Sequence, residues 1–524
     1  MKKNLLRKFL LMSFIFAGAI SSVDGQTEVV RDQIFPQDLI NVNGALFFQP
    51  LNIAGDQLWK SDGTYSGTTM VKDLYPGTSD HTFENPFVFQ GKLYFVAGYS
   101  SQDKALWKSD GTAAGTEIVL QPFTDNITGS LVATNDYFYF TISSKLTKSD
   151  GTAAGTSTIT KNSIPVQPST SSNYVWSNNK LFFTDVTNKE LWVTDGTDAG
   201  TQLVKLIVTG NSNSYGINKM TNVNGIVYFF AADGQYGNTN KGFELWRSDG
   251  TDAGTYMVKD INPGMGSSLL TGLDNTVMVA YAGLVYFNAT DGTHEGLWKS
   301  DGTDAGTVLV KEGITLTPKH VITNNKFFFR GSDRHLWITD GTNAGTMLLD
   351  SAEISNLVSE NMVGYNGIVY YPAADTDQQL NEDELWQSDG TPAGTFIVEN
   401  IGSYTTAGDP HDLTIVDDYL YFGVRKDFAL RRLKMGTGSS TGISDISKTD
   451  FSIHPNPASN IVTLTNLSNN TSVSITDLAG KQIYSTIANT TELSINTGGF
   501  ANGVYLVNVS TAGNMVNKKL IINH

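Results

Sequence analysis

Cysteine is absent from the 524-residue chain. Its absence excludes disulfide bonds, thiol catalysis, cysteine-ligated zinc, iron–sulfur clusters and a lipidated N-terminal cysteine. A secreted protein without disulfides must bury enough apolar surface to be stable unaided. Charged residues make up only 16% of the chain, whereas aromatic residues make up 11% and glycine occurs 51 times. This composition is typical of a globular protein rich in strands and turns.

Long apolar runs are also absent after the first 25 residues, so we expect no transmembrane segment once they are removed. The start itself reads as a secretory signal peptide: four basic residues lie within the first eight, an apolar run follows at 9–20, and small residues precede a polar one. We predict cleavage between Gly25 and Gln26. An uncleaved anchor is the alternative, but the run is shorter than the roughly 20 residues that a bilayer requires.

Positive charge is scarce. Removal of residues 1–25 leaves 31 Lys and Arg against 50 Asp and Glu, which is a net charge of about −19. Such a surface repels a phosphate backbone. We therefore expect neither nucleic acid nor an anionic membrane as a partner.

One sequence motif of the form LWxSDGTxAGT, which we call the phrase, recurs along the chain. Its eight copies begin at Leu58, Leu106, Leu146, Leu191, Leu245, Leu297, Leu336 and Leu385. The intervals of 39 to 54 residues match the period of propeller blades. An aromatic strand precedes every copy, and the second unit contains four short strand-like segments, which together make one blade.

A ninth unit is eroded. Its aromatic strand "DYLYFGV" is followed by "FALRRLKMGTG", which lacks a convincing fourth strand. A spare strand lies at the other end of the chain, because "TEVVRDQ" at 27–33 resembles "TEIVLQP" at 116–122. We predict that this N-terminal strand completes the last blade and closes the ring, which leaves no large unpaired sheet edge.

The predicted fold is therefore all-β, with a β-propeller of eight or nine four-stranded blades and a small C-terminal β-sandwich. The predicted segments are a signal peptide at 1–25, the propeller at 26–435, a Gly/Ser/Thr linker at 436–450 and the sandwich at 451–524.

Each residue type in the phrase has a mechanical interpretation. Leu and Trp point to opposite faces of a strand, each toward a neighbouring blade. Asp accepts N–H bonds across the turn, and Gly supplies positive φ. The residues given this structural role are Trp59, Asp62, Trp107, Asp110, Asp150, Trp192, Asp195, Trp246, Asp249, Trp298, Asp301, Trp337, Asp340, Trp386 and Asp389.

A catalytic role for the repeated aspartates is disfavoured, because catalysis needs different groups that converge on one point. Identical groups spaced around a ring do not converge. Repeated calcium or glycan sites are the remaining alternative. The third copy carries Thr147 in place of Trp, which marks the tryptophan as a packing residue that one blade can lack.

The phrase resembles the ELWxxDGT repeat of large extracellular proteins from Bacteroidetes-type bacteria, and this resemblance covers residues 45–430. It is also similar, more loosely, to the Asp-box turn of sialidase-like propellers. That second resemblance implies a similar turn and no sialidase activity, because the carboxylate-binding arginine triad of sialidases cannot be assigned to this sequence.

The last 74 residues resemble the type A C-terminal sorting domain of the type IX secretion system. "HPNPASNIVTL" corresponds to its opening motif, with Pro455, Asn456 and Pro457, and "GVYLVNV" and "NKKLIIN" correspond to its final strands. His454 stands where the family usually has Tyr. The resemblance implies the type IX secretion machinery as a partner, and transit through the periplasm to the outer cell surface or the extracellular space. A carbohydrate-binding sandwich is the alternative.

Sequence signals for chemistry are few. None of the seven histidines forms a close-spaced metal motif. The most irregular acidic stretch contains Asp375, Asp377, Glu382 and Asp383. Its oxygen ligands could hold calcium, but the spacing matches no EF-hand, so we favour a solvated loop. No other cofactor is expected.

We interpret the whole chain as a secreted or cell-surface, non-enzymatic binding or adhesion propeller, with a glycan or an extracellular protein as ligand. A polysaccharide-acting propeller enzyme, either a glycoside hydrolase or a lyase, is the first alternative, because two carboxylates in a central channel would suffice for it. A structural surface-layer protein is the second.

Overall fold

The computed structural model describes residues 27–51, 57–75, 82–98, 104–123, 127–169, 173–209, 216–232, 241–270, 277–354, 361–374, 383–399, 409–435, 452–465, 467, 471–477, 482–511 and 514–524. The chain divides into two compact units, 1–440 and 441–524. No helix among these described residues has the length and apolar character needed to cross a membrane. The predicted signal peptide and its cleavage site, Gly25 and Gln26, lie outside the described residues.

The first unit consists of four-stranded antiparallel sheets, nine of them within the described ranges. Sheet one contains β2 (Pro36–Val42), β3 (Ala45–Pro50), β4 (Gln57–Ser61) and β5 (Thr69–Asp73). Sheet two contains β6 (Thr82–Phe89), β7 (Lys92–Gly98), β8 (Lys104–Ser109) and β9 (Glu117–Phe123). Sheet three contains β10 (Ile127–Ala133), β11 (Phe138–Ile142), β12 (Lys145–Ser149) and β13 (Ser157–Thr158), and a small hairpin follows it, β14 (Thr160–Lys161) and β15 (Ile164–Pro165).

The same meander continues through the middle of the chain. Sheet four contains β16 (Val175–Ser177), β17 (Lys180–Thr184), β18 (Glu190–Thr194) and β19 (Gln202–Leu206). Sheet five contains β20 (Asn218–Val223), β21 (Ile226–Ala232), β22 (Phe243–Ser248) and β23 (Tyr256–Lys259). Sheet six contains β24 (Met278–Tyr281), β25 (Leu284–Thr290), β26 (Glu295–Ser300) and β27 (Val308–Glu312).

The last three sheets bring the chain back to its start. Sheet seven contains β28 (Leu316–Thr323), β29 (Lys326–Gly331), β30 (Leu336–Thr339) and β31 (Met347–Leu348). Sheet eight contains β32 (Val363–Tyr365), β33 (Ile368–Ala374), β34 (Asp383–Ser388) and β35 (Thr395–Glu399), with the short 3-10 helix η4 (Pro392–Gly394) before its last strand. Sheet nine contains β36 (Pro410–Val416), β37 (Tyr419–Val424) and β38 (Ala429–Lys434), and β1 (Glu28–Arg31) is its fourth strand.

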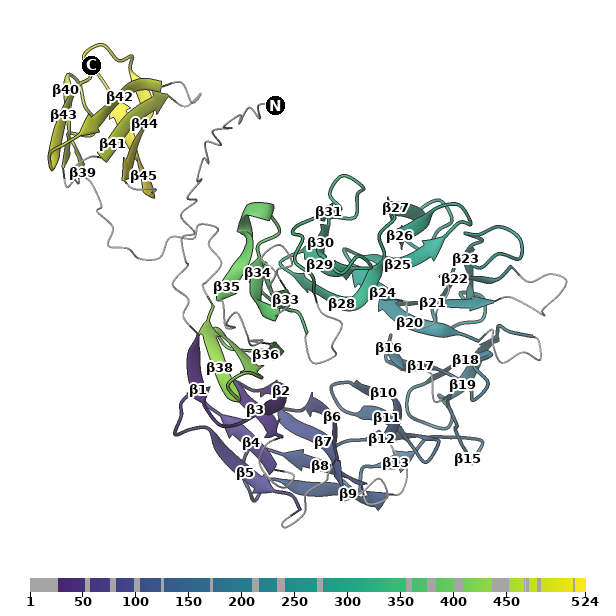
Figure 1. The fold of residues 1–524 in the computed structure, drawn as a ribbon. Helices are drawn as coiled ribbons and strands as arrows, with labels where there is room; N and C mark the ends of the chain where they lie inside the picture. Colours follow the sequence, from purple (N-terminus) through teal and green to yellow (C-terminus); the bar gives the residue numbers. More distant parts are fainter. Residues whose placement is uncertain are drawn as a thin grey trace, which may run out of the picture. The chain divides into compact units, whose positions relative to one another are not determined.

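The sheets form a closed β-propeller. A separate cluster of buried apolar side chains lies between each sheet and the next, and one further cluster joins sheet nine to sheet one. In Figure 1 the green strands β36 and β38 accordingly lie beside the purple strands β1 and β2. The all-β propeller predicted from the repeats is confirmed, and the large aromatic content forms these interfaces.

The N-terminal closing strand is also confirmed. In sheet nine Glu28 lies opposite Arg432 and Val29 lies opposite Arg431, and a register shift follows. Sheet two has the same pattern: Glu117 opposite Lys108, Ile118 opposite Trp107, and then a shift. The split sheet therefore has the same register as a sheet built from one continuous stretch of chain.

The strand order places the strands at defined depths in the ring. First strands of neighbouring sheets pack against one another, as β2 does with β6 and β36, so they line the inside. Fourth strands lie at the opposite edge of each sheet. Because the strands are antiparallel, the turns from strand one to two and from three to four lie on one rim, and the other connections lie on the opposite rim.

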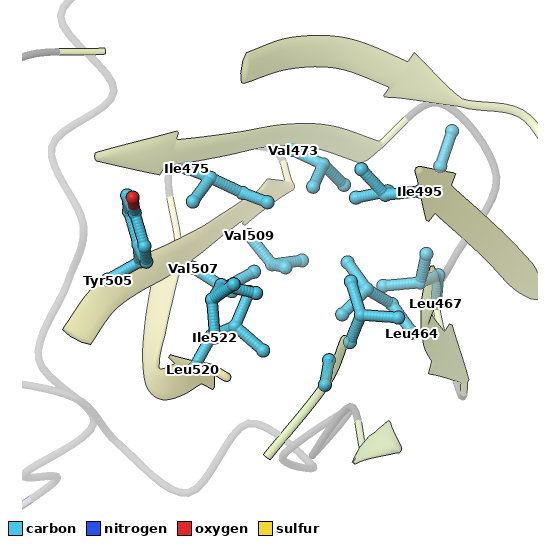
Figure 2. Close-up of a cluster of buried hydrophobic side chains, with 13 residues drawn as sticks. Leu464, Leu467, Val473, Ile475, Ile495, Tyr505, Val507, Val509, Leu520 and Ile522 are labelled. Atoms are coloured by element: carbon cyan, nitrogen blue, oxygen red, sulfur yellow. The ribbon is translucent and has the colours of Figure 1, made fainter. Parts of the chain in front are cut away.

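The second unit is a β-sandwich of two antiparallel sheets, as its strand pattern predicts. One sheet contains β39 (Ser452–His454), β40 (Ile461–Thr465) and β43 (Glu492–Asn496). The other contains β42 (Gln482–Ala488), β41 (Thr471–Asp477), β44 (Gly503–Thr511) and β45 (Asn514–Ile522). Figure 2 shows the apolar core between them, which includes Leu464, Ile475 and Val507.

Candidate functional site

The repeated phrase forms the turn between the third and fourth strands. In sheet five, Asp249 Oδ1 accepts hydrogen bonds from the Thr251 N–H (2.9 Å) and hydroxyl (2.7 Å). The Thr251 hydroxyl in turn accepts the Gly254 N–H at 3.0 Å. Ser248 and Thr255 close the base of the turn through their hydroxyl groups, 2.7 Å apart. Each of the four polar side chains therefore has a partner inside the turn.

The same network occurs in all eight copies. The distance from the Asp oxygen to the Thr nitrogen is 2.8 or 2.9 Å in each of them. The threonine hydroxyl and N–H donors stabilise the charged carboxylate, so they lower the pKa of seven of these aspartates. The seven are Asp62, Asp110, Asp150, Asp195, Asp249, Asp301 and Asp340. A carboxylate held in this way acts as a structural acceptor.

The two glycine positions of the phrase require glycine for different physical reasons. Gly302 has φ +87°, and a Cβ on it would lie 2.5 Å from the Tyr228 hydroxyl of the preceding sheet. The turn therefore packs directly on its neighbour. Gly254 has no positive φ, but a Cβ there would lie 2.1 Å from Asp249 Oδ1. The second glycine is required by the aspartate itself, which sequence reasoning did not detect.

Leu and Trp of the phrase pack on opposite sides of the sheet. Leu245 belongs to the apolar cluster between sheets five and six, whereas Trp246 belongs to the cluster between sheets four and five. The tryptophan lies opposite Met257 on the fourth strand. In the copy that lacks the tryptophan, Thr147 lies opposite Thr158, so both members of the pair are changed together. The pair behaves as a packing unit.

The turn rim and the opposite rim differ in variability. On the turn rim, most connections from strand one to strand two have two residues, such as 43–44 and 224–225, and the repeated turn supplies the rest. On the opposite rim, the connections from strand two to strand three range from two residues (143–144) to ten (233–242). We call this second edge the variable rim. The connections on the variable rim therefore differ in length and sequence, whereas the strands that they join repeat from sheet to sheet.

Several inner strands carry a bulge near the variable rim. Four inner-strand residues at a register shift have left-handed backbones: Asp38 (φ 53°), Asn85 (53°), Lys219 (48°) and Asp412 (53°). Their side chains are partly or fully exposed and differ in charge. These positions therefore present different chemistry from one sheet to the next, which sequence reasoning missed.

Two of these bulges meet where the ring closes. Burial, and then the nearby Asp412 carboxylate, raise the pKa of Asp38 to about 6. Asp412 Oδ2 lies 3.1 Å from Nδ1 of His411, whose side chain is fully buried. The Thr414 hydroxyl of sheet nine donates to the Leu39 carbonyl of sheet one at 2.8 Å. A signal was present in the sequence: Pro-x-Asp-Leu occurs at 36–39 and again at 410–413.

The glutamate before the phrase in sheet five shapes the variable rim. The Glu244 carboxylate is fully buried and accepts N–H bonds from Ile261 (2.8 Å), Asn262 (3.4 Å) and Ser268 (3.2 Å). Burial nevertheless raises its pKa to about 8. These contacts hold the connection between sheets five and six, which gives this acidic residue a structural role.

The acidic stretch proposed as a weak calcium candidate is described only in part. Asp375, Asp377 and Glu382 lie outside the described residues. Asp383 begins β34, and its carbonyl accepts the Asp409 N–H at 3.1 Å. Within the described ranges, no three His, Asp or Glu side chains are grouped so that they could hold a metal ion.

In the sandwich, hydrogen bonds join the opening motif to the last strand, β45. The Asn456 side chain donates to the Lys519 carbonyl (2.7 Å) and accepts from the Ile521 N–H (2.8 Å). Ala458 also bonds to the backbone of β45 through its N–H. The asparagine between Pro455 and Pro457 therefore joins the beginning of the domain to its end.

That arrangement agrees with a family comparison. Residues 452–523 match the family described as "Secretion system C-terminal sorting domain". The match supports export by the type IX secretion system, and it points to the cell surface or the extracellular space as the destination. No curated protein matches the chain.

Several solved structures resemble the chain at low identity. PorZ of Porphyromonas gingivalis, described as an essential surface component of the type IX secretion system, is 12% identical with a TM-score of 0.23, covering 95% of this chain and 100% of that one. BamB from Moraxella catarrhalis is 13% identical with a TM-score of 0.35, covering 69% and 100%. The extracellular domain of BT4673 from B. thetaiotaomicron is 10% identical with a TM-score of 0.27, covering 96% and 75%. At these values the resemblance has no bearing on activity or partners.

Proposed function

We propose that this protein is an exported, surface-displayed propeller that binds a glycan or an extracellular protein on its variable rim, without catalysis. The observation that carries the proposal is the division between the two rims. One rim is built from eight near-identical turns whose polar groups are bonded internally. The other has connections of unequal length and inner-strand bulges of unequal charge. A scaffold whose packed turns repeat, and whose connections differ along one edge, is suited to binding a ligand at that edge.

The experiment is a glycan and protein array probed with the chain from residue 26, with the supernatant assayed for released sugar. Lys219→Asn changes a bulge on the variable rim and keeps a residue that tolerates a left-handed backbone. Asn179→Gly is the matched control, because Asn179 is exposed on the turn rim with φ 60°. We expect stable binding that Lys219→Asn weakens and Asn179→Gly does not. Equal loss in both variants would contradict the proposal, and no ligand at all would favour a structural surface layer.

A polysaccharide-acting enzyme is the second candidate, and the Asp38–Asp412 pair favours it. Burial raises the pKa of Asp38 to about 6, and a second carboxyl group lies near it; two carboxyl groups of this kind are the residues that glycoside cleavage requires. If binding decays as sugar fragments appear, and Asp412→Asn stops their release, the enzyme assignment replaces the binding one.

A further inference from the structure

Sheet nine differs from the other described sheets in how its fourth strand is attached. Elsewhere the fourth strand follows the third through the repeated turn or its equivalent. In sheet nine, Leu433 and Lys434 occupy the positions that Ser and Asp hold in the other copies of the phrase. The fourth strand, β1, comes from a part of the chain 404 residues away. The hydroxyl and carboxylate network of the turn is therefore missing from this joint.

Apart from Val30, which belongs with Ile34 to the apolar cluster that joins sheet nine to sheet one, the side-chain contacts of β1 are ionic or polar. Glu28 forms an ion pair with Arg432 at 2.8 Å, and the Thr27 hydroxyl accepts a bond from Arg431 at 3.1 Å. The Arg31 guanidinium lies over the Tyr65 ring, 4.2 Å from its centroid. Among these strand residues only Val30 is buried, with 2% of its surface exposed. In sheet nine, charged side chains hold the fourth strand, whereas in the other sheets the repeated turn holds it.

The apolar cross-strand pair is weakened at the same place. Val29 is 51% exposed, whereas its counterpart in sheet two, Ile118, is 37% exposed. Val29 lies opposite Arg431, at the position that tryptophan occupies opposite Ile118. The strand therefore lacks the tryptophan contact that its counterpart has.

The attachment becomes strong immediately after β1. Ile34 is 2% exposed, and its N–H donates to the Phe428 carbonyl at 2.8 Å. The Phe35 ring contacts the rings of His411 and Phe428 edge-on, with centroids 5.1 and 5.8 Å apart. Gln33, between the weak and the strong part, has φ 57°. A residue with a left-handed backbone therefore separates β1 from the contacts of Ile34 and Phe35.

We infer that residues 27–31 form a salt-sensitive latch, which leaves sheet nine by turning at Asp32 and Gln33 while Ile34 and Phe35 keep the ring closed. Release uncovers the hydrogen-bonding edge of β38 together with Arg431 and Arg432. The latch opens before any other fourth strand, because each of those strands is joined to its third strand through the hydrogen-bonded repeated turn. Salt promotes opening, since the Glu28–Arg432 pair is at the surface and is screened.

The test is amide hydrogen exchange on the chain from residue 26, at 50 and 500 mM sodium chloride. β9 is the internal reference, because it has the same register and a matching Lys108–Glu117 pair at 3.0 Å. We expect β1 to exchange faster than β9, and salt to widen the difference. Glu28→Ala should speed exchange of β1 by about two- to five-fold, the range for a surface ion pair. Glu117→Ala is the matched control and should leave β9 unchanged.

A cross-link gives a second readout. Because the chain has no cysteine, Val29→Cys with Arg431→Cys can form only one disulfide within a molecule. Oxidation should slow exchange of residues 27–31 relative to the reduced form, while β9 stays the same. Equal protection of β1 and β9 in the unmodified chain at both salt concentrations would overturn the inference, whether or not the cross-linked variant folds.

Discussion

At the residue scale, the eight-fold phrase is explained by contacts within the turn and with the preceding sheet. Asp249 fixes the turn and also excludes any side chain from position 254, while Gly302 brings the next turn against Tyr228. The first glycine is predictable from sequence, since turns favour positive φ there. The second is not, because its cause is a side-chain contact that only the folded turn shows.

Replacing Gly254 with Ala should lower the free energy of unfolding by about 1–3 kcal/mol, the usual cost of overpacking. The added Cβ would lie 2.1 Å from Asp249 Oδ1. Thermal denaturation of Gly254→Ala, Asp249→Ala and the double variant forms a double-mutant cycle. We expect the double variant to lose less than the sum of the two single losses. Strict additivity would mean that the glycine serves another purpose.

Replacing Trp246 with Ala should cost about 3–5 kcal/mol of stability, because it opens a cavity between two sheets. Trp246 is 8% exposed, and its indole N–H donates to the Ala231 carbonyl at 3.0 Å. Trp337 is only half-buried, so Trp337→Ala should cost less. Melting temperatures of the two variants measure the difference. Unchanged melting with lost ligand binding would instead make the tryptophans a recognition surface.

At the element scale, the inner strands depart most from the simple repeat. Strand positions were predictable from alternating and aromatic runs, as in β7 and β21. The bulges were not predictable, because one extra residue breaks the two-residue alternation of side chains from which strands are predicted. The duplicated Pro-x-Asp-Leu, at both ends of the propeller, is the trace that they leave in the sequence.

Asp38 should make the closing interface pH-dependent. Its pKa is about 6 in the folded state against an ordinary value of 3.8, so the folded protein binds the proton more tightly than the unfolded one. The stabilisation is fully present below about pH 4 and is lost as the pH rises through 6. Asp38→Asn should remove this part of the pH dependence in denaturation experiments. Asp412→Asn should shift it to lower pH, because one repelling charge is gone. A stability profile that Asp38→Asn leaves unaltered would contradict the assignment.

At the scale of the whole molecule, the fold was predictable because identical units must pack in identical ways. The position of the closing strand followed from one short resemblance, between 27–33 and 116–122, and the structure pairs both segments in the same register. The ligand surface was not predictable, since it consists of what differs between units. No pattern in a single sequence distinguishes a variable position from an unimportant one.

Deleting residues 451–524 should leave the propeller folded, because residues of the first unit build the apolar clusters between its sheets. The chain should then accumulate in the periplasm, since the sorting domain is gone. Cell fractionation with surface protease treatment measures this. A second variant, Asn456→Ala, breaks the bonds to β45 and should reduce export less severely. Normal surface display of the deletion would contradict the role assigned to the domain.

The split ninth sheet also bears on how such a protein changes in evolution. Because β1 and the strands β36 to β38 build one sheet together, a gain or loss of one unit between equivalent turns would leave that sheet intact. A propeller with one unit more or one unit fewer would therefore close through the same split sheet.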